Sequence, residues 1–149
     1  MPRFFIFLGI LVSLCQITHA ACDPSGPRIG SIAPEFTARD LLTRERIPLS
    51  SQRGKIIILS FRASWCPPCR RELPLLENAQ VLLGKDKLTV FAVNYREHTE
   101  AMRDVAKLAA KWHITIVDDP LGWIASHYAV SKIPHLFVIG RDGTSSPTT

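Results

Sequence analysis

The feature that most constrains the fold of this chain is a C-x-x-C pair placed where a buried strand gives way to a helix. Residues 56–61 (Ile-Ile-Ile-Leu-Ser-Phe) form a continuous, mostly β-branched run, which is typical of a strand buried on both faces. A short loop follows, and Cys66 opens a helix whose first position is Pro67, where a missing N–H is tolerated. A helix that starts at the end of a buried strand is typical of α/β proteins.

The rest of the chain repeats this alternation, and its 149 residues allow one domain. An extended segment with a small hairpin is expected at 29–50. The patterns then predict strands at 56–61, 88–94, 114–117 and 136–139, and helices at 66–83, 100–112 and 121–128. Strands that alternate with helices predict a mostly parallel sheet covered by helices. Core positions of the first helix are expected at Leu73, Leu76, Ala79, Val81 and Leu82.

The N-terminus has the layout of a secretory signal peptide. Arg3 precedes an apolar run from Phe4 to Leu14, and Thr18-His19-Ala20 places small residues before a cleavage point. The run is too short to span a bilayer of about 30 Å comfortably, and an uncleaved anchor is the alternative. We therefore expect a signal peptide at 1–20, a linker at 21–28 and one domain at 29–149.

Export would place the domain in the periplasm, or on the extracytoplasmic side of the cell membrane, where disulfides persist. Cys15 lies in the predicted signal peptide, and Cys22 comes just after it. Cleavage before Cys22 would allow a lipid anchor there, as in bacterial lipoproteins; the alternative is an unpaired thiol in the linker. Cys66 and Cys69 remain as the pair within the domain.

The charge of the chain does not indicate a nucleic-acid partner. Its 18 Lys and Arg residues against 13 Asp and Glu residues give a net charge of +5. The charges are scattered and mixed in sign, and aromatic residues do not interleave with the basic ones. We expect a solvated mixed surface with no nucleic-acid-binding face. A hydrophobic fraction of 46% excludes a disordered chain.

The Cys66–Cys69 pair predicts thiol–disulfide exchange. A thiolate at Cys66 would face the free N–H groups and the positive dipole end of the helix N-terminus, an environment that stabilises thiolates. Cys69 lies one helical turn further inside. Cys66 is therefore expected to attack a substrate disulfide, and Cys69 to resolve the mixed disulfide.

A structural disulfide and a metal site are the alternatives for this pair. A disulfide that closes so short a loop stabilises little, because the entropy term grows with loop length. Zinc requires about four ligands, and only Cys22 and a histidine such as His135 could join the pair, at no recognisable spacing. A copper-handling module would use Cys66, Cys69 and His135 as soft ligands.

The segment around the cysteines resembles the active site of TlpA/ResA-type thioredoxin-like proteins. The similarity lies in residues 61–74 (Phe-Arg-Ala-Ser-Trp-Cys-Pro-Pro-Cys-Arg-Arg-Glu-Leu-Pro) and continues at 30–36, 93–94 and 130–134. It implies a thioredoxin-like α/β fold with a central mixed sheet flanked by helices. It also implies an exported thiol–disulfide oxidoreductase without a cofactor, which takes electrons from a membrane thiol donor and reduces disulfides of envelope proteins, such as apocytochromes c awaiting haem.

Other functions stay open beside this one. Peroxiredoxins share the motif at 30–36 (Gly-Ser-Ile-Ala-Pro-Glu-Phe), but such enzymes need a Thr three residues before the reactive cysteine, which this chain lacks before Cys66. The alternatives that are not enzymes are the copper-handling module and a catalytically inactive, truncated binding protein.

The resemblance assigns roles to residues that surround the pair. Pro134 falls at the family's cis-proline, which faces the disulfide, and Ile133 before it pairs with substrate backbone. Three further residues next to the cysteines are expected to contact substrate: Trp65, Pro67 and Pro68.

Two acidic residues also match the family. Glu72 follows Cys69 by three positions, and Glu97 follows the predicted strand 88–94. An acid near the pair could accept the proton of Cys69 during resolution. An exposed surface carboxylate is the alternative for each.

The chain departs from the family at two places. Ser60 lies where thioredoxin keeps a buried Asp, so that proton route is expected to be absent. Residues 143–149 (Gly-Thr-Ser-Ser-Pro-Thr-Thr) are polar, so the last strand and the C-terminal helix of the family are expected to be missing. Strand 136–139 would then keep a partly unpaired edge beside an exposed apolar face, which predicts a homodimer.

Overall fold

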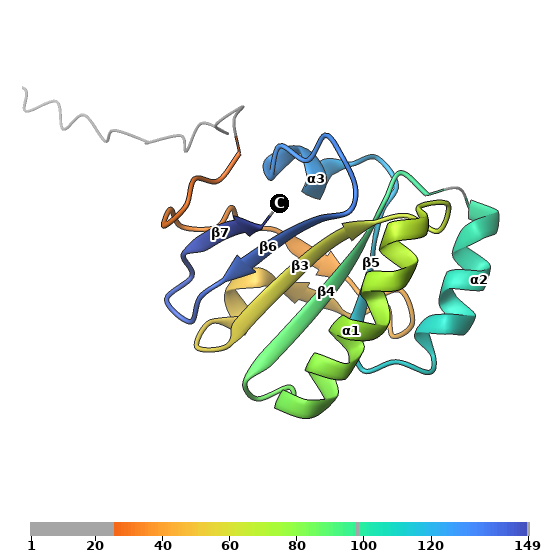
Figure 1. The fold of residues 1–149 in the computed structure, drawn as a ribbon, viewed down its shortest axis with the longest axis horizontal. Helices are drawn as coiled ribbons and strands as arrows, with labels where there is room; N and C mark the ends of the chain where they lie inside the picture. The colour runs from red at the N-terminus through yellow and green to blue at the C-terminus, as the bar shows by residue number, and fades with distance from the viewer. Residues whose placement is uncertain (1–25, 98, 149) are drawn as a thin grey trace, which may run out of the picture.

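The computed structural model describes residues 26–97 and 99–148. The predicted signal peptide, Cys15, Cys22 and most of the predicted linker lie outside these residues. The chain forms a five-stranded sheet in the order β5-β4-β3-β6-β7 and a separate two-stranded hairpin (Figure 1). The strands are β1 (Thr37–Arg39), β2 (Arg46–Pro48), β3 (Ile56–Arg62), β4 (Leu88–Tyr95), β5 (Thr115–Asp119), β6 (His135–Ile139) and β7 (Ser145–Thr148). The helices are the 3-10 helix η1 (Leu49–Gln52), α1 (Pro67–Leu83), α2 (Thr99–Ala109) and α3 (Trp123–His127).

The sheet combines parallel and antiparallel strands. Strands β3, β4 and β5 run parallel, whereas β6 pairs antiparallel with β3. The carboxyl ends of the three parallel strands therefore share one edge, where Arg62, Asn94 and Asp118 occupy the same register position. The predicted α/β architecture, a mixed central sheet flanked by helices, is confirmed.

Each face of the sheet is covered by its own layer (Figure 1). Helices α1 and α2 cover one face, where they pack on β4 and β5 through Leu73, Leu76, Met102, Val105 and Ala109. The segment around the hairpin and α3 cover the other face through Phe36, Ala38, Leu49, Ile124 and Tyr128. Alternate residues of β3 contribute to the two layers. The prediction of a strand buried on both faces holds for one face, whereas Ile56 and Ile58 are only half-buried on the other.

The prediction that the last strand is missing is wrong. Strand β7 pairs antiparallel with β6 and places Pro147, which cannot donate a backbone hydrogen bond, in an outer strand of the sheet, where proline is tolerated. On its other side, β7 forms backbone hydrogen bonds with Gly30 and Ser31. The Gly30 N–H donates to Ser145 O, and the Ser145 N–H donates to Ser31 O, both at 2.8 Å. Backbone hydrogen bonds on both sides hold a strand that shows no apolar alternation. Within the described residues, no helix follows β7.

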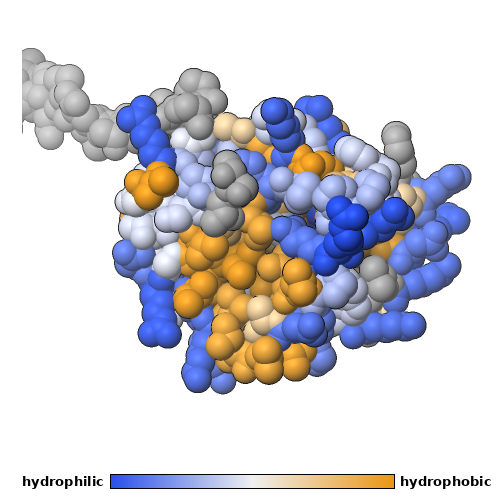
Figure 2. All heavy atoms as spheres, in the orientation of Figure 1, coloured by the Kyte–Doolittle hydropathy of each residue, from blue (hydrophilic) through white to orange (hydrophobic). Residues whose placement is uncertain are grey.

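One face of the sheet is only partly covered. Figure 2 shows an apolar patch on the side of the molecule that carries α1. Ile56 and Ile58 of β3, with Leu136 and Val138 of β6, are half-buried on this face, so it is less open than the exposed apolar face that the sequence predicts. No helix in the described part of the chain is long and apolar enough to cross a membrane.

The buried side of α1 differs from the prediction near its end. Val81 and Leu82, expected in the core, are 55% and 83% exposed. Gln80 is buried instead, and its side-chain amide donates to Leu88 O and accepts from Val90 N–H. The amide thus bonds to the backbone of β4 from the helix face that packs on the sheet.

Candidate active site

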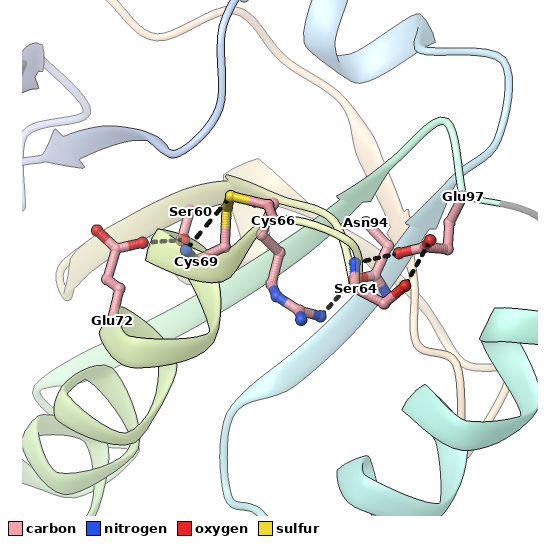
Figure 3. The surroundings of a disulfide bond; sticks show 8 residues. Ser60, Ser64, Cys66, Cys69, Glu72, Asn94 and Glu97 are labelled. Carbon is pink, nitrogen blue, oxygen red and sulfur yellow. Dashed lines mark hydrogen bonds between the residues drawn. A yellow bond between two sulfur atoms is a disulfide. The ribbon is translucent and has the colours of Figure 1, made fainter.

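The two cysteines lie at the start of α1 and form a disulfide (Figure 3). Cys66 is the N-cap residue of the helix, and its Sγ accepts a hydrogen bond from the backbone N–H of Cys69 at 3.3 Å. Cys66 is 4% exposed and Cys69 is 1% exposed. Cys66 is thus slightly the less buried residue of the two, and its sulfur accepts a hydrogen bond from an N–H group of the first helical turn. This geometry suits Cys66 for attack and Cys69 for resolution.

The surface around the disulfide is formed by exposed rings. The indole of Trp65 is 61% exposed, and Pro67 and Pro68 also face solvent. These three predicted substrate contacts therefore lie on the surface next to the nearly buried sulfurs. A protruding apolar surface of this kind fits a polypeptide better than a small molecule, which binds in an enclosed pocket.

The loop before β6 meets the cysteines from the other side. The Ile133–Pro134 peptide bond is cis, as the resemblance implies. The side chain of Ile133 packs against Ala63, Cys66 and Cys69, and Pro134 is exposed. Ile133 therefore lies at the active site, and Pro134 follows it at the surface.

Glu97 holds the loop that leads into Cys66. Its carboxylate accepts hydrogen bonds from the backbone N–H of Ser64 at 2.6 Å and from the Ser64 hydroxyl at 2.8 Å (Figure 3). Glu97 is 7% exposed, so the alternative of an exposed surface carboxylate does not apply to it. Because each of its oxygens binds Ser64, this geometry suits Glu97 for positioning the loop.

Glu72 lies on α1 and accepts a hydrogen bond from Ser60, the residue at the position where thioredoxin keeps a buried Asp. The hydroxyl of Ser60, which is fully buried in β3, donates to the Oε2 of Glu72 at 3.0 Å (Figure 3). Ser60 therefore supplies no carboxylate at this buried position, but its hydroxyl is hydrogen-bonded to the carboxylate of Glu72 on α1. Glu72 is half-buried, so it is also not a fully exposed surface acid.

Arg62 and Asn94 form a buried pair that the sequence reasoning missed. The Nη1 of Arg62 donates to the Oδ1 of Asn94 at 2.7 Å, and the two residues are 3% and 0% exposed. Burial lowers the pKa of Arg62, and the negative charges of Glu97 and Glu72 act in the opposite direction. The signal in the sequence was a cation at the end of an apolar strand, with an amide at the end of the next strand.

The metal alternatives gain no support from the geometry. Among residues 26–97 and 99–148, no group of three or more His, Cys, Asp or Glu side chains is placed to hold a metal ion. The ring of His135 packs on Phe137 at 4.7 Å between ring centroids, and burial lowers the pKa of this histidine.

Known proteins share both the fold and the chemistry of this site. Residues 29–144 match the AhpC/TSA family. The thiol-disulfide oxidoreductase ResA of Geobacillus thermodenitrificans is 34% identical over 145 residues, which cover 95% of this chain and 81% of that protein. The relationship to ResA favours thiol–disulfide exchange over the peroxidase alternative.

Solved structures agree with the sequence comparison. A Bacteroides thetaiotaomicron protein described as a candidate protein disulfide isomerase superimposes with a TM-score of 0.72 at 32% identity, covering 85% of this chain and 82% of that one. A secreted disulfide oxidoreductase of Mycobacterium tuberculosis gives a TM-score of 0.62 at 28% identity, covering 76% and 81%. With a thioredoxin-like fold and a cysteine pair at the start of α1, the chain belongs to the AhpC/TSA family as a thiol–disulfide oxidoreductase of the ResA/TlpA type.

Proposed function

We propose that this thiol–disulfide oxidoreductase reduces disulfides of proteins outside the cytoplasm, with apocytochromes c among its substrates. The observation that carries this proposal is the Cys66–Cys69 disulfide at a helix N-terminus, surrounded by the exposed rings of Trp65, Pro67 and Pro68. A site of this shape is accessible to a cystine on a polypeptide surface. The direction of the reaction, towards reduced substrate, rests on the resemblance to ResA/TlpA proteins.

The reaction transfers two electrons from the dithiol to the substrate. The Cys66 thiolate attacks one sulfur of the substrate disulfide, the substrate S–S bond breaks, and the released substrate thiolate takes up a proton. Cys69 then loses its proton and attacks the Sγ of Cys66, which releases the second substrate thiol and forms the Cys66–Cys69 disulfide. A membrane thiol donor reduces this disulfide for the next cycle.

The proton of Cys69 requires an acceptor, and we assign this role to Glu72 acting through Ser60. Support comes from the hydrogen bond between Ser60 and Glu72 and from the position of Glu72 one turn after Cys69 on α1. Glu97, whose two oxygens bind Ser64, positions the loop instead. This refines the expectation that both acids serve as proton acceptors.

The proposed location is the periplasm or the extracytoplasmic side of the membrane. It rests on the signal-peptide pattern of residues 1–20 and on similarity to a structure described as a secreted disulfide oxidoreductase. A lipid anchor at Cys22 is the alternative to a free mature chain. N-terminal mass spectrometry of envelope fractions distinguishes a chain that starts at Ala21 from one that starts at lipidated Cys22, and intact Met1 in the cytoplasm would contradict export.

The equilibrium potential of the Cys66–Cys69 couple tests the direction of the reaction. A reductase is expected near the value of thioredoxin, about −270 mV, whereas a strong oxidant such as DsbA lies near about −120 mV. Titration of the full chain against glutathione, with the thiol state read by alkylation and mass spectrometry, gives this value. A potential near that of DsbA would overturn the proposed direction but leave thiol–disulfide exchange intact.

A further inference from the structure

A small cleft lies behind the active-site loop. It has a volume of about 250 Å³, which is below the range of about 300–1,000 Å³ that is usual for small-molecule sites. Its walls come from the end of β3, the loop before Cys66, the first turn of α1 and one side of α2. The lining residues are Arg62, Ser64, Arg70, Ala101, Asp104 and Val105.

The guanidinium of Arg62 is only partly satisfied at this cleft. Arg62 is 3% exposed, and its Nη1 is bound to Asn94. The Nε is buried and has no hydrogen-bond partner among the described residues. The Nη2 also makes no hydrogen bond with the described residues, because the bond to Asn94 uses Nη1. The Nε and Nη2 groups form the edge of the guanidinium that binds a carboxylate with two parallel hydrogen bonds. Arg62 lines the cleft, and this edge of its guanidinium has no partner among the described residues.

The nearby acids of the protein do not pair with this edge. Glu97 and Glu72 are close enough to attract the charge of Arg62, but Glu97 binds Ser64 with each of its oxygens and Glu72 binds Ser60. Asp104, on the cleft wall, forms an ion pair with Lys107 at 3.1 Å. A buried polar group without a partner is costly, and a carboxylate from outside would remove this cost.

We propose that this cleft, the Arg62 cleft, binds the carboxylate of an Asp or Glu side chain that lies within about three residues of the substrate cysteine. The proposal rests on the proposed function, because the ligand belongs to the polypeptide whose disulfide is reduced. Two lining residues are close to the cysteines in the sequence: Ser64 lies two residues before Cys66, and Arg70 directly follows Cys69. Arg70 adds a second positive charge, and Ala101 and Val105 provide an apolar wall for the methylene groups.

Binding of unreactive peptides tests the proposal independently of turnover. Each peptide carries Ser in place of the substrate cysteine. The peptides are made in matched pairs, which have Glu or Gln at one position within three residues of this Ser and are otherwise identical. Titration of the oxidised full chain by calorimetry should give about tenfold tighter binding of at least one Glu peptide. Acetate serves as the free carboxylate: acetate binding without any difference between Glu and Gln peptides would overturn the assignment to substrate.

Three variants locate the effect. Arg62→Gln removes the charge, and Ala101→Phe fills the cleft from half-exposed α2 without changing charge; both should bring the ratio of Glu to Gln affinities to about one. Arg71→Gln is the matched control, because Arg71 is exposed on α1 and does not line the cleft, and it should keep the ratio. Thermal melting checks that each variant is folded. If Arg62→Gln does not fold, the affinity ratio measured with Ala101→Phe tests the Arg62 cleft.

The outcomes separate this site from the proposed function. A ratio of one in the wild-type protein, or a ratio that persists in Ala101→Phe and in folded Arg62→Gln, overturns the Arg62 cleft as a carboxylate site. Reduction of cystine versions of the same peptides is measured in parallel. A retained affinity ratio without any reduction would contradict the proposed reductase while supporting the binding site.

Discussion

Glu97 binds Ser64 through both carboxylate oxygens, at 2.6 Å to the backbone N–H and 2.8 Å to the hydroxyl. Two residues before Ser64 and three before Glu97, the side chains of Arg62 and Asn94 make a second contact between the same two segments. The loop that carries Cys66 is thus tied to the end of β4 at two points. This explains how a short loop at a sheet edge holds the attacking sulfur in a defined position.

Glu97→Gln should weaken this attachment. Both Ser64 groups donate to a charged acceptor, and the amide replaces these charge-assisted hydrogen bonds with weaker neutral ones, at a cost of about 1–3 kcal/mol in the free energy of unfolding. A misplaced loop should also lower kcat/KM for insulin-disulfide reduction by about 10- to 100-fold. Urea unfolding and the insulin assay measure these effects, with exposed Glu100→Gln as control. Unchanged stability and kinetics would show that the contact does not position the loop.

The order of attack can be read from trapped intermediates. Because Cys66 caps the helix and is the less buried residue of the two, Cys69→Ser should accumulate mixed disulfides with substrate, whereas Cys66→Ser should trap none. Mass spectrometry of non-reduced samples identifies the linked cysteine. Trapping through Cys69 in the Cys66→Ser variant would reverse the assignment.

Glu72→Gln should slow the resolution step. Loss of a proton acceptor typically lowers a rate by about 10²- to 10⁴-fold, and the mixed disulfide should therefore live longer. The effect should diminish as the pH rises, because hydroxide then removes the Cys69 proton. The decay of a preformed mixed disulfide, followed against pH, separates this role from a structural one: a uniform slowing at every pH would indicate a structural contribution only.

The ionisation of Glu77 makes the stability of the folded protein depend on pH. Its carboxylate accepts hydrogen bonds from the N–H groups of His113 and Ile114 and lies 2.7 Å from the Nδ1 of His113. Burial acts to raise the pKa of Glu77, but these hydrogen bonds outweigh it and the pKa lies below its usual value. The folded state therefore favours the ionised form, so this stabilisation is present above the unfolded-state pKa of about 4.3 and is lost as the pH falls through the lower folded-state pKa.

Glu77→Gln tests this dependence. The variant should be less stable than the wild type by about 1–3 kcal/mol at neutral pH, because the N–H groups of His113 and Ile114, just before β5, lose a charged acceptor. The difference should narrow as the pH falls below about 4. Urea midpoints across pH measure it, and a difference that does not change with pH would contradict the role of the carboxylate charge.

The half-buried apolar face predicts self-association. Ile58 and Val138 are register partners on β3 and β6 and lie on the incompletely covered face, and exposed apolar patches commonly mark association surfaces. Val138→Thr keeps the β-branched shape but reduces the apolar area, so it should shift a dimer towards monomer in sedimentation experiments. Ile32→Thr, at an exposed position on another segment, is the control. A wild-type monomer at high concentration would contradict this prediction.

Short-range patterns in the sequence determined most of the secondary structure. The β-branched run at 56–61 became β3, and Pro67 and Gly84 mark the start and end of α1 as predicted. The position of Cys66 at the helix N-terminus follows from the same few residues. These features depend on neighbours along the chain, so they can be read without knowing the rest of the fold.

Other features were decided only when distant segments met. Strand β7 has no apolar alternation and forms because its backbone bonds to β6 on one side and to the segment near Ser31 on the other. Ser64 and Glu97 are 33 positions apart, and Arg62 and Asn94 are 32 apart. Each pair meets because the register of β3 against β4 aligns the ends of two parallel strands. The sequence determined the chemistry of the cysteine pair. The tertiary structure decided which polar groups position it, because buried polar side chains need hydrogen-bond partners, and the alignment of β3 with β4 brings these partners together.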